Sequence, residues 1–381
     1  MKVINIVNSF IGKKGNIGLR TSYIIDELNT QNIGNVSYSR GVVAKHKLNN
    51  KNMGFLGHIP RILNAYRIYF NLWFNHRKYD IWLFEKWFSI SFKDMKSNKK
   101  IAHIWENSPK IIKNLKDKGY IILLDIPIAP SCTGKNLVDS FPDSIELHYH
   151  KYNDELERES YKLVDYIISP SIFVKDEIVK LGIDQNKVFI VPFGVELKDG
   201  YKKEFSKNYK KEGIDFCFAG TINKRKGIGF LLEAWNDNIF KNDRLHLCGR
   251  LYPEIEELIK KYNFINVITP GFVDTKEYFK KCDVYIFPSL LEGSSKSIYE
   301  AMNMSMPCIA TPNSGSVIEN NTDGIIIDVA SVKQIKSVMV KFKTNSELVK
   351  TMGKNAYKNV QNYSWKNYAE NIINIYKKVS E

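Results

Sequence analysis

Two glutamates, Glu292 and Glu300, have the spacing and setting to bind a ligand that carries both hydroxyl and phosphate groups. An apolar run, Asp283–Phe287, predicts a strand that ends just before them, and a helical pattern begins near Lys296. One carboxylate is therefore expected on the loop after the strand, and the other in the first turn of the helix. Backbone N–H groups at a helix N-terminus lie between them and suit a phosphate. Carboxylates for sugar hydroxyls beside amides for a diphosphate predict a sugar-nucleotide site.

The same spacing has a purely structural interpretation. Ser297 and Glu300 also fit a capping box, in which Glu300 would only hold a backbone N–H of its own helix. Glu292 would then be an ordinary solvated acid on a loop. Spacing alone leaves both interpretations open.

A second candidate segment lies upstream, where the run Lys224-Arg225-Lys226 follows a predicted strand and Gly227 precedes a predicted helix. Cations that converge on a phosphate can stabilise a leaving diphosphate without a metal ion. Taken by itself, this segment could equally be a solvated basic turn.

Together these segments resemble the signatures of retaining glycosyltransferases of family 4, the group 1 set with the two-lobed GT-B fold. The first signature is matched by Pro288-Ser289, Glu292-Gly293, Glu300-Ala301-Met302 and Pro307, and the second by Arg225-Lys226-Gly227. The chain departs from the family where Thr221 replaces a frequent arginine and Ser305 replaces a usual glycine. The resemblance implies an α/β protein with two Rossmann-like lobes, whose parallel sheets face a central cleft.

The resemblance also implies roles for individual residues. Arg225 and Lys226 would neutralise the departing diphosphate, Glu292 would orient the sugar ring, and Glu300 would bind the ribose. The other donor-binding residues that it implies lie around these segments and in a glycine-rich loop of the first lobe: Gly293, Ser294, Ser295, Lys296, Ser297, Ile298, Gly220, Thr221, Phe272, Gly15 and Asn16.

Many family members place a histidine on a cleft loop of the first lobe, and the predicted loop after Leu124 has none. His103, which follows another predicted strand, is the candidate replacement. The alternative is that His103 is a packed or solvated residue, as a lone histidine often is.

Short apolar runs alternate with helical patterns along the chain, which is typical of parallel α/β folds. We predict a first lobe at 1–195, joined by a returning C-terminal helix at 364–381, and a second lobe at 196–363. The strands expected in the first lobe are Lys2–Val7, Ile81–Phe84, Ile101–Ile104, Tyr120–Leu124, Tyr166–Ile168 and Val188–Val191.

The composition narrows the class of protein. Five cysteines without paired short spacing indicate buried thiols, as in a reducing cytoplasm. No apolar run reaches about 18 residues, so no membrane span is expected. No Asp-x-Asp occurs, so we expect no metal and no cofactor apart from the donor. The formal charge is +15, but the sequence contains no zinc-finger spacing and no RNA-recognition signature. Nucleic acid is therefore not the predicted partner.

One stretch suggests contact with an anionic membrane. Residues 60–78 interleave arginines with aromatic and aliphatic side chains, like a basic amphipathic helix in the interfacial plane. An ordinary helix packed on a sheet, with exposed arginines, explains the pattern as well. A location in the cytoplasm, at the inner face of a membrane if the first interpretation holds, is the expectation.

We therefore predict a retaining, metal-independent glycosyltransferase. It would use a nucleoside-diphosphate sugar and a glycan or polyprenyl-linked acceptor in surface polysaccharide synthesis. The alternatives are a sugar-nucleotide epimerase or a phosphorylase of the same fold, and a two-lobed subunit that binds a sugar nucleotide without turnover. The sequence does not define the nucleotide base, the sugar, the linkage or the oligomeric state.

Overall fold

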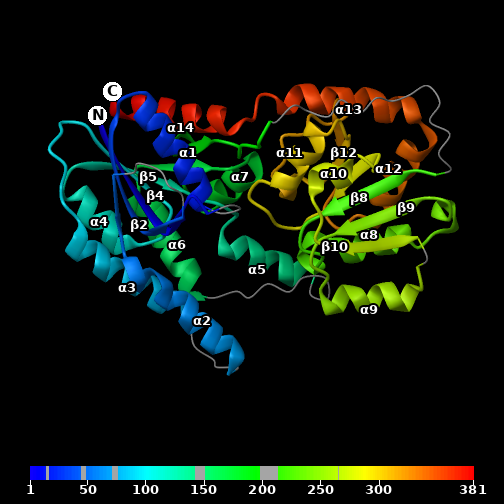
Figure 1. Cartoon of the computed structure of the whole chain (residues 1–381), viewed down its shortest axis with the longest axis horizontal. Coiled ribbons are helices and arrows are strands. Elements are labelled where there is room, and N and C mark those ends of the chain that lie inside the picture. Colours follow the sequence, from blue (N-terminus) through cyan, green and yellow to red (C-terminus); the bar gives the residue numbers. More distant parts are fainter. Residues whose placement is uncertain (14–16, 44–48, 71–75, 142–150, 198–212, 265) are drawn as a thin grey trace.

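Two parallel β-sheets form the framework of the chain in the computed structural model, which describes residues 1–13, 17–43, 49–70, 76–141, 151–197, 213–264 and 266–381. The first sheet has the order β3-β2-β1-β4-β5-β6-β7 and the second the order β10-β9-β8-β11-β12-β13. The sheets occupy opposite ends of the molecule (Figure 1). Gly15 and Asn16, which are predicted to bind the donor, lie outside the described residues, as do residues 198–212.

The first sheet has apolar central strands and two polar strands, β2 and β3, at one edge. Asn5 of β1 is in register with Ser37 of β2 and His103 of β4, so a polar row crosses three strands at one level. The strands are β1 (Lys2–Ile11), β2 (Gly34–Val42), β3 (Asn50–Asn52), β4 (Lys100–Ile104), β5 (Tyr120–Asp125), β6 (Tyr166–Ser169) and β7 (Val188–Ile190).

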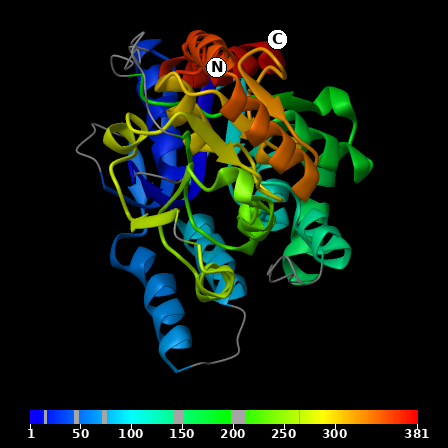
Figure 2. The same ribbon diagram turned by 90° about the vertical axis from the view of Figure 1, so that its right-hand side faces the viewer.

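Helices cover both faces of this sheet. One face packs against α1 and the C-terminal helix α14, and the other packs against α3 and α4. The helix α2 projects away from both sheets (Figures 1 and 2). The helices of this lobe are α1 (Ile17–Thr30), α2 (Ile59–Tyr69), α3 (His76–Ser91), α4 (Pro109–Lys116), α5 (Ser131–Ser140), α6 (Lys151–Leu163) and α7 (Ile172–Lys180).

The second sheet carries the largest hydrophobic core, and its inner strands are buried on both faces as expected of a parallel sheet, whereas the edge strand β10 is partly exposed. Its strands are β8 (Asp215–Ala219), β9 (Arg244–Cys248), β10 (Val267–Gly271), β11 (Val284–Phe287), β12 (Cys308–Ala310) and β13 (Gly324–Ile326). Its helices are α8 (Ile228–Trp235), α9 (Pro253–Tyr262), α10 (Thr275–Phe279), α11 (Lys296–Asn303), α12 (Val332–Thr344) and α13 (Ser346–Val360).

The C-terminal helix returns to the first lobe. α13 packs on the second lobe, whereas α14 (Trp365–Ser380) lies beside α1 on the first (Figure 1). An isolated parallel β-bridge joins Val195 to Ser364, so the two segments that connect the lobes lie side by side there. The predicted lobe boundaries remain predictions, but the connections between the two sheets run through these segments.

One predicted strand is wrong. Ile81–Phe84 lies within α3, because a four-residue apolar run fits a buried helix turn as well as a strand. The strands β2 and β3 were not predicted, since their polar sequences lack an apolar run. Among the described residues, we find no helix both long and apolar enough to cross a bilayer.

Candidate active site between the lobes

The loop after β11 is held in place by backbone hydrogen bonds to two neighbouring turns. The amide of Leu290 donates to the carbonyl of Arg225 over 3.0 Å, and that of Glu292 donates to the carbonyl of Asn313, also over 3.0 Å. The amide of Ser295 donates to the carbonyl of Ser314 over 3.1 Å. The turns that follow β8 and β12 therefore position the loop on which Glu292 lies.

The basic turn η3 (Lys224–Lys226) owes its shape to its two flanking residues. Asn223 precedes the turn, and its side-chain oxygen accepts from the amide of Lys226 over 3.3 Å. Gly227 follows with φ of +71°, in the left-handed region that favours glycine. A Cβ at Gly227 would lie 2.0 Å from the carbonyl oxygen of Pro288. Glycine is thus required for the close approach of the turn to the loop.

Four side chains converge on this loop. Oε1 of Glu292 accepts from Nη1 of Arg225 over 2.6 Å, from Nζ of Lys226, and from Oγ of Ser289 over 3.0 Å. The guanidinium of Arg225 also donates to the carbonyl of Leu291 over 2.5 Å. The two cations predicted to bind a diphosphate and the acid predicted to bind a sugar therefore meet at one carboxylate oxygen.

Burial shifts the pKa of one member of this cluster, Lys226. Desolvation lowers the pKa of Lys226, attraction to Glu292 partly restores it, and the neighbouring Arg225 lowers it further. The ammonium also lies 4.8 Å from the ring centroid of Phe287, over its face. The side chain of Lys226 is 11% exposed, against 23% for that of Arg225. The lysine thus forms the inner wall of the cluster and the arginine its outer edge.

Glu300 lies in α11, the helix that follows this loop. Among the described residues, its carboxylate has no hydrogen bond to a backbone amide at the start of that helix. Its carboxylate is 3.1 Å from Nζ of Lys296 and accepts from Oγ1 of Thr275 over 3.3 Å. Ser297 lies inside the helix, and its hydroxyl is 2.7 Å from the phenol of Tyr285. The capping-box interpretation is therefore wrong, whereas the predicted start of the helix at Lys296 is confirmed.

The segment between the two glutamates faces the first lobe. A Cβ at Gly293 would lie 1.9 Å from the carbonyl oxygen of Pro127, which follows β5. The hydroxyl of Ser294 lies 2.6 Å from the phenol of Tyr299. Of the predicted phosphate-binding amides, those of Ser295 and Ile298 already donate within the protein.

A pocket of about 300 Å³ opens between the lobes at this point. The second lobe contributes Ser294 and Lys296, at the start of α11. The first lobe and the connecting segments contribute Ile17, Leu19, Arg20, Pro127, Phe193 and Trp365. The pocket has the volume of a small-ligand site, and residues from both lobes are needed to form it.

The remaining predicted residues of the second lobe lie around the ends of β8 and β10. Gly220 has φ of +150°, and its carbonyl oxygen lies so close to Gly249 that a Cβ there would be 1.9 Å away. Thr221 is half-buried directly after it. Phe272 is 85% exposed at the end of β10, where an aromatic ring is open to a planar ligand.

His103 was predicted to follow its strand, and this prediction is wrong. It lies within β4, is fully buried, and stacks on Trp105 at 3.8 Å between ring centroids. Nδ1 lies 2.5 Å from the phenol of Tyr376 in α14, and Nε2 lies 3.4 Å from Oδ2 of Asp125. Desolvation lowers the pKa of the imidazole. These contacts give His103 a structural role beneath α14.

Sequence reasoning missed two residues of the cleft. Arg20 of α1 lines the pocket and pairs with Asp125, its Nη1 lying 3.0 Å from Oδ1. Ser289 contributes a hydrogen bond to Glu292. Ser289 is part of the quoted Pro-Ser motif, which could have identified it. No local pattern distinguishes Arg20, because its partner is 105 positions away.

The comparisons with known proteins agree with this architecture. Residues 201–359 match the family model described as Glycosyl transferases group 1. An uncharacterized glycosyltransferase of Methanocaldococcus jannaschii is 26% identical over 223 residues, 57% of this chain and 60% of that protein. Alpha-monoglucosyldiacylglycerol synthase of Acholeplasma laidlawii is 26% identical over 231 residues, 55% of this chain and 57% of that protein.

The solved structure of sucrose-phosphate synthase from Thermosynechococcus elongatus aligns with a TM-score of 0.69 at 16% identity, over 100% of this chain and 99% of that one. The two facing lobes define a protein of the GT-B fold. Residues 201–359, in the second half of the chain, are similar to the group 1 glycosyl transferases. The alignments cover under two thirds of the curated relatives' length.

Proposed function

We propose that the protein is a retaining glycosyltransferase that moves a sugar from a nucleoside-diphosphate sugar to a glycan or lipid-linked acceptor in surface polysaccharide synthesis. The convergence of Arg225 and Lys226 on Glu292, beside the N-terminus of α11 and the pocket between the lobes, carries this proposal. The two cations of this cluster supply the positive charge that stabilises a diphosphate as it leaves. One relative matched above is named a glucosyl-lipid synthase, which supports a lipid-linked acceptor.

The cluster suggests how charge is balanced during the reaction. Without ligand, Glu292 neutralises the two cations. When a diphosphate enters, its oxygens offer Arg225 and Lys226 alternative charge-assisted hydrogen bonds. Glu292 is then released toward the sugar, where a carboxylate stabilises positive charge developing at the anomeric carbon. The C–O bond to the diphosphate breaks as the acceptor oxygen attacks from the same face, and the acceptor's proton passes to the departing phosphate oxygen.

The first turn of α11 would bind the phosphates. Because the amides of Ser295 and Ile298 are engaged, we assign the contacts to the amides of Lys296 and Ser297, at the positive end of the helix. Glu300, near Lys296 and Thr275, would accept hydrogen bonds from the ribose. Phe272 would lie against the base. None of these contacts involves a metal ion or a cofactor, and we propose a metal-independent reaction.

The helix α2 is the proposed contact with an anionic membrane, at its cytoplasmic face. Exposed apolar side chains lie along it and just beyond its ends, and residues 50–79 contain arginines and lysines but no acid. Arg61 and Arg67 supply cations on α2 itself. Charge and apolar area together favour interfacial binding. If Arg61→Gln with Arg67→Gln leaves binding to phosphatidylglycerol vesicles unchanged, the helix has no such role.

Thermal unfolding with UDP, GDP, ADP, CMP and their sugar conjugates tests the donor site. A ligand at about 100 times its dissociation constant stabilises the folded state by roughly 2.7 kcal/mol. We expect one nucleotide to raise the midpoint, and Arg225→Ala with Lys226→Ala to abolish the rise. If no nucleotide shifts the midpoint, the donor-site assignment fails.

Product analysis then separates the rival activities. A transferase forms a new glycosidic bond, and NMR coupling at its anomeric proton shows whether configuration is retained. An epimerase converts the donor without an acceptor, and a binding subunit returns it unchanged.

A further inference from the structure

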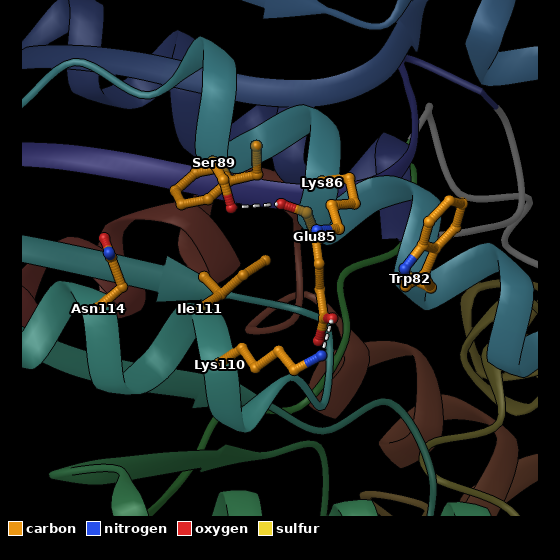
Figure 3. A pocket seen from close by; sticks show the side chains of 8 residues that line it. Trp82, Glu85, Lys86, Ser89, Lys110, Ile111 and Asn114 are labelled. Carbon is orange, nitrogen blue, oxygen red and sulfur yellow. Dashed lines mark hydrogen bonds and ion pairs between the residues drawn. The ribbon is translucent and has the colours of Figure 1, made fainter.

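A pocket of about 370 Å³ lies on the first lobe, between α3 and α4 and outside the pocket described above. Trp82 and Glu85 of α3 line one side, and Lys110 and Asn114 of α4 line the other (Figure 3). Its apolar lining includes Phe88 and Ile111, both buried. A deeply buried apolar base with polar side chains above it is typical of a small-ligand site.

The carboxylate of Glu85 is fixed at this pocket. Its Oε1 accepts from the hydroxyl of Ser108 over 2.6 Å. Its Oε2 lies 3.5 Å from Nζ of Lys110 (Figure 3). Ser108 is itself the N-cap of α4 and accepts from the amide of Ile111 over 3.2 Å. The side chain of Glu85 is 12% exposed and that of Lys110 is 78% exposed. The acid is therefore rigid, while its lysine partner can move aside at little cost.

Trp82 gives the pocket an aromatic surface. It is half exposed, so part of its large apolar surface stays in water and would gain from being covered by a ligand. A flat indole near a fixed carboxylate suits a molecule with one apolar face and a rim of hydroxyls. A pyranose ring has this form, because its C–H groups lie on one face and its hydroxyls point outward.

We propose that the α3–α4 pocket binds a pyranose unit of a glycan. The ring would stack on Trp82, and its hydroxyls would donate to Glu85. This inference rests on the proposed function. It implies that the acceptor is a glycan that extends beyond the cleft along the first lobe. Arg77 of α3 bonds to Glu106, which follows β4 at the carboxyl edge of the first sheet. Glu85 is eight positions after Arg77, so it lies roughly 12 Å farther along the helix from that edge.

Binding of oligosaccharides to the full chain tests the proposal without any donor or turnover. The probes are maltohexaose, chitohexaose and hexagalacturonate, titrated calorimetrically up to about 20 mM, a range that detects millimolar affinities. We expect at least one to bind. Trp82→Ala should weaken that binding about tenfold, a loss of about 1.4 kcal/mol. Glu85→Gln should weaken it less, and saturating UDP should not displace the glycan.

Tyr69→Ala is the matched control, because Tyr69 is an aromatic residue of α2 that is 82% exposed and lies outside the pocket. Trp82→Phe keeps an aromatic face and should retain most of the affinity, should Trp82→Ala fold poorly. The proposal is overturned if none of the three glycans binds, if Tyr69→Ala weakens binding as much as Trp82→Ala, or if UDP displaces the glycan. Loss of the donor site would appear separately, as the absence of any nucleotide-induced rise in the unfolding midpoint.

Discussion

Both lobes bury charged side chains near the carboxyl ends of their strands, but the two clusters differ in what covers them. In the second lobe, Arg225 and Lys226 meet Glu292 on a loop that borders the pocket between the lobes. In the first lobe, Asp125 lies beneath α14, where Arg20, His103 and the phenol of Tyr368 surround it. The open cluster can exchange a protein partner for a ligand, whereas Asp125 of the covered one is sealed from solvent and only its partner Arg20 reaches the pocket. Burial of charge by itself therefore does not identify a catalytic group.

The protonation states follow the same division. Attraction to Arg20 and the hydrogen bond from His103 lower the pKa of Asp125 against the opposing effect of its burial, so it stays ionised. Burial lowers the pKa of Arg20, but attraction to Asp125 and Tyr368 raises it above its ordinary value, and the guanidinium remains charged. In the open cluster, by contrast, burial lowers the pKa of Lys226 despite the nearby Glu292. A phosphate beside Lys226 would raise this pKa again.

The largest effect should come from breaking the covered cluster. Asp125→Ala leaves Arg20 as an uncompensated buried charge, which typically costs about 3–5 kcal/mol. We expect the free energy of unfolding, measured by urea denaturation, to fall by that amount. Asp125→Asn keeps the size of the side chain and should cost less. A loss below about 1 kcal/mol in Asp125→Ala, the size typical of a surface ion pair, would show that the cluster is solvated.

The open cluster should respond in the opposite way. Lys226→Met removes a cation that would bind the leaving diphosphate, and loss of one such group typically lowers kcat by about 10²–10³-fold. Stability should stay unchanged or rise, because a charge is no longer buried. The measurements are steady-state turnover and thermal unfolding of the same preparation. A destabilised variant with unaltered turnover would assign Lys226 a structural role.

The pH dependence of turnover should separate lysine from arginine at this position. In the free protein the pKa of Lys226 lies below its usual value of about 10.5, so the cationic form is lost as pH rises through that lowered value. kcat/KM should therefore fall on the alkaline side. Lys226→Arg, which stays charged to higher pH, should move this fall upward by at least one pH unit. An unshifted alkaline limb in Lys226→Arg would mean that another group titrates there.

The smallest effect concerns His103. Its folded-state pKa lies below the unfolded value of about 6.5, so the unfolded chain binds more protons between these two values. Stability from this group is therefore present above about pH 6.5 and decreases as pH falls toward the lowered pKa. His103→Gln should flatten the dependence of the unfolding midpoint on pH in this window. A variant with the same pH profile as the parent would show that His103 does not titrate there.

The second lobe was largely predictable from its sequence, because its signals are local. A strand, a turn and a helix follow one another within about twenty residues around Arg225 and again around Glu292, and each motif contains the glycines or serines that its turn requires. The geometry of Gly227 against Pro288 is the physical reason for one of those glycines. What these motifs do chemically remains a prediction that the experiments above address.

The first lobe was less predictable, because its strands and partners are defined by distant residues. The apolar run at Ile81–Phe84 became part of a helix, since the flanking sequence continues a helical turn in both directions. The polar strand β2 forms because β1 and β3 flank it and satisfy its backbone. His103 was predicted near the cleft, but the return of α14 covers it with Tyr376.

The sequence alone determined the parallel α/β class, the start of α11 at Lys296, and the motifs that place a glutamate and two cations after neighbouring strands. These features depend on patterns within a few turns of chain. The tertiary structure alone decided that one carboxylate oxygen of Glu292 receives both cations, that Arg20 reaches the pocket between the lobes, and that His103 is sealed beneath the C-terminal helix. Those outcomes depend on contacts between segments far apart in the chain, which no local pattern of residue types encodes.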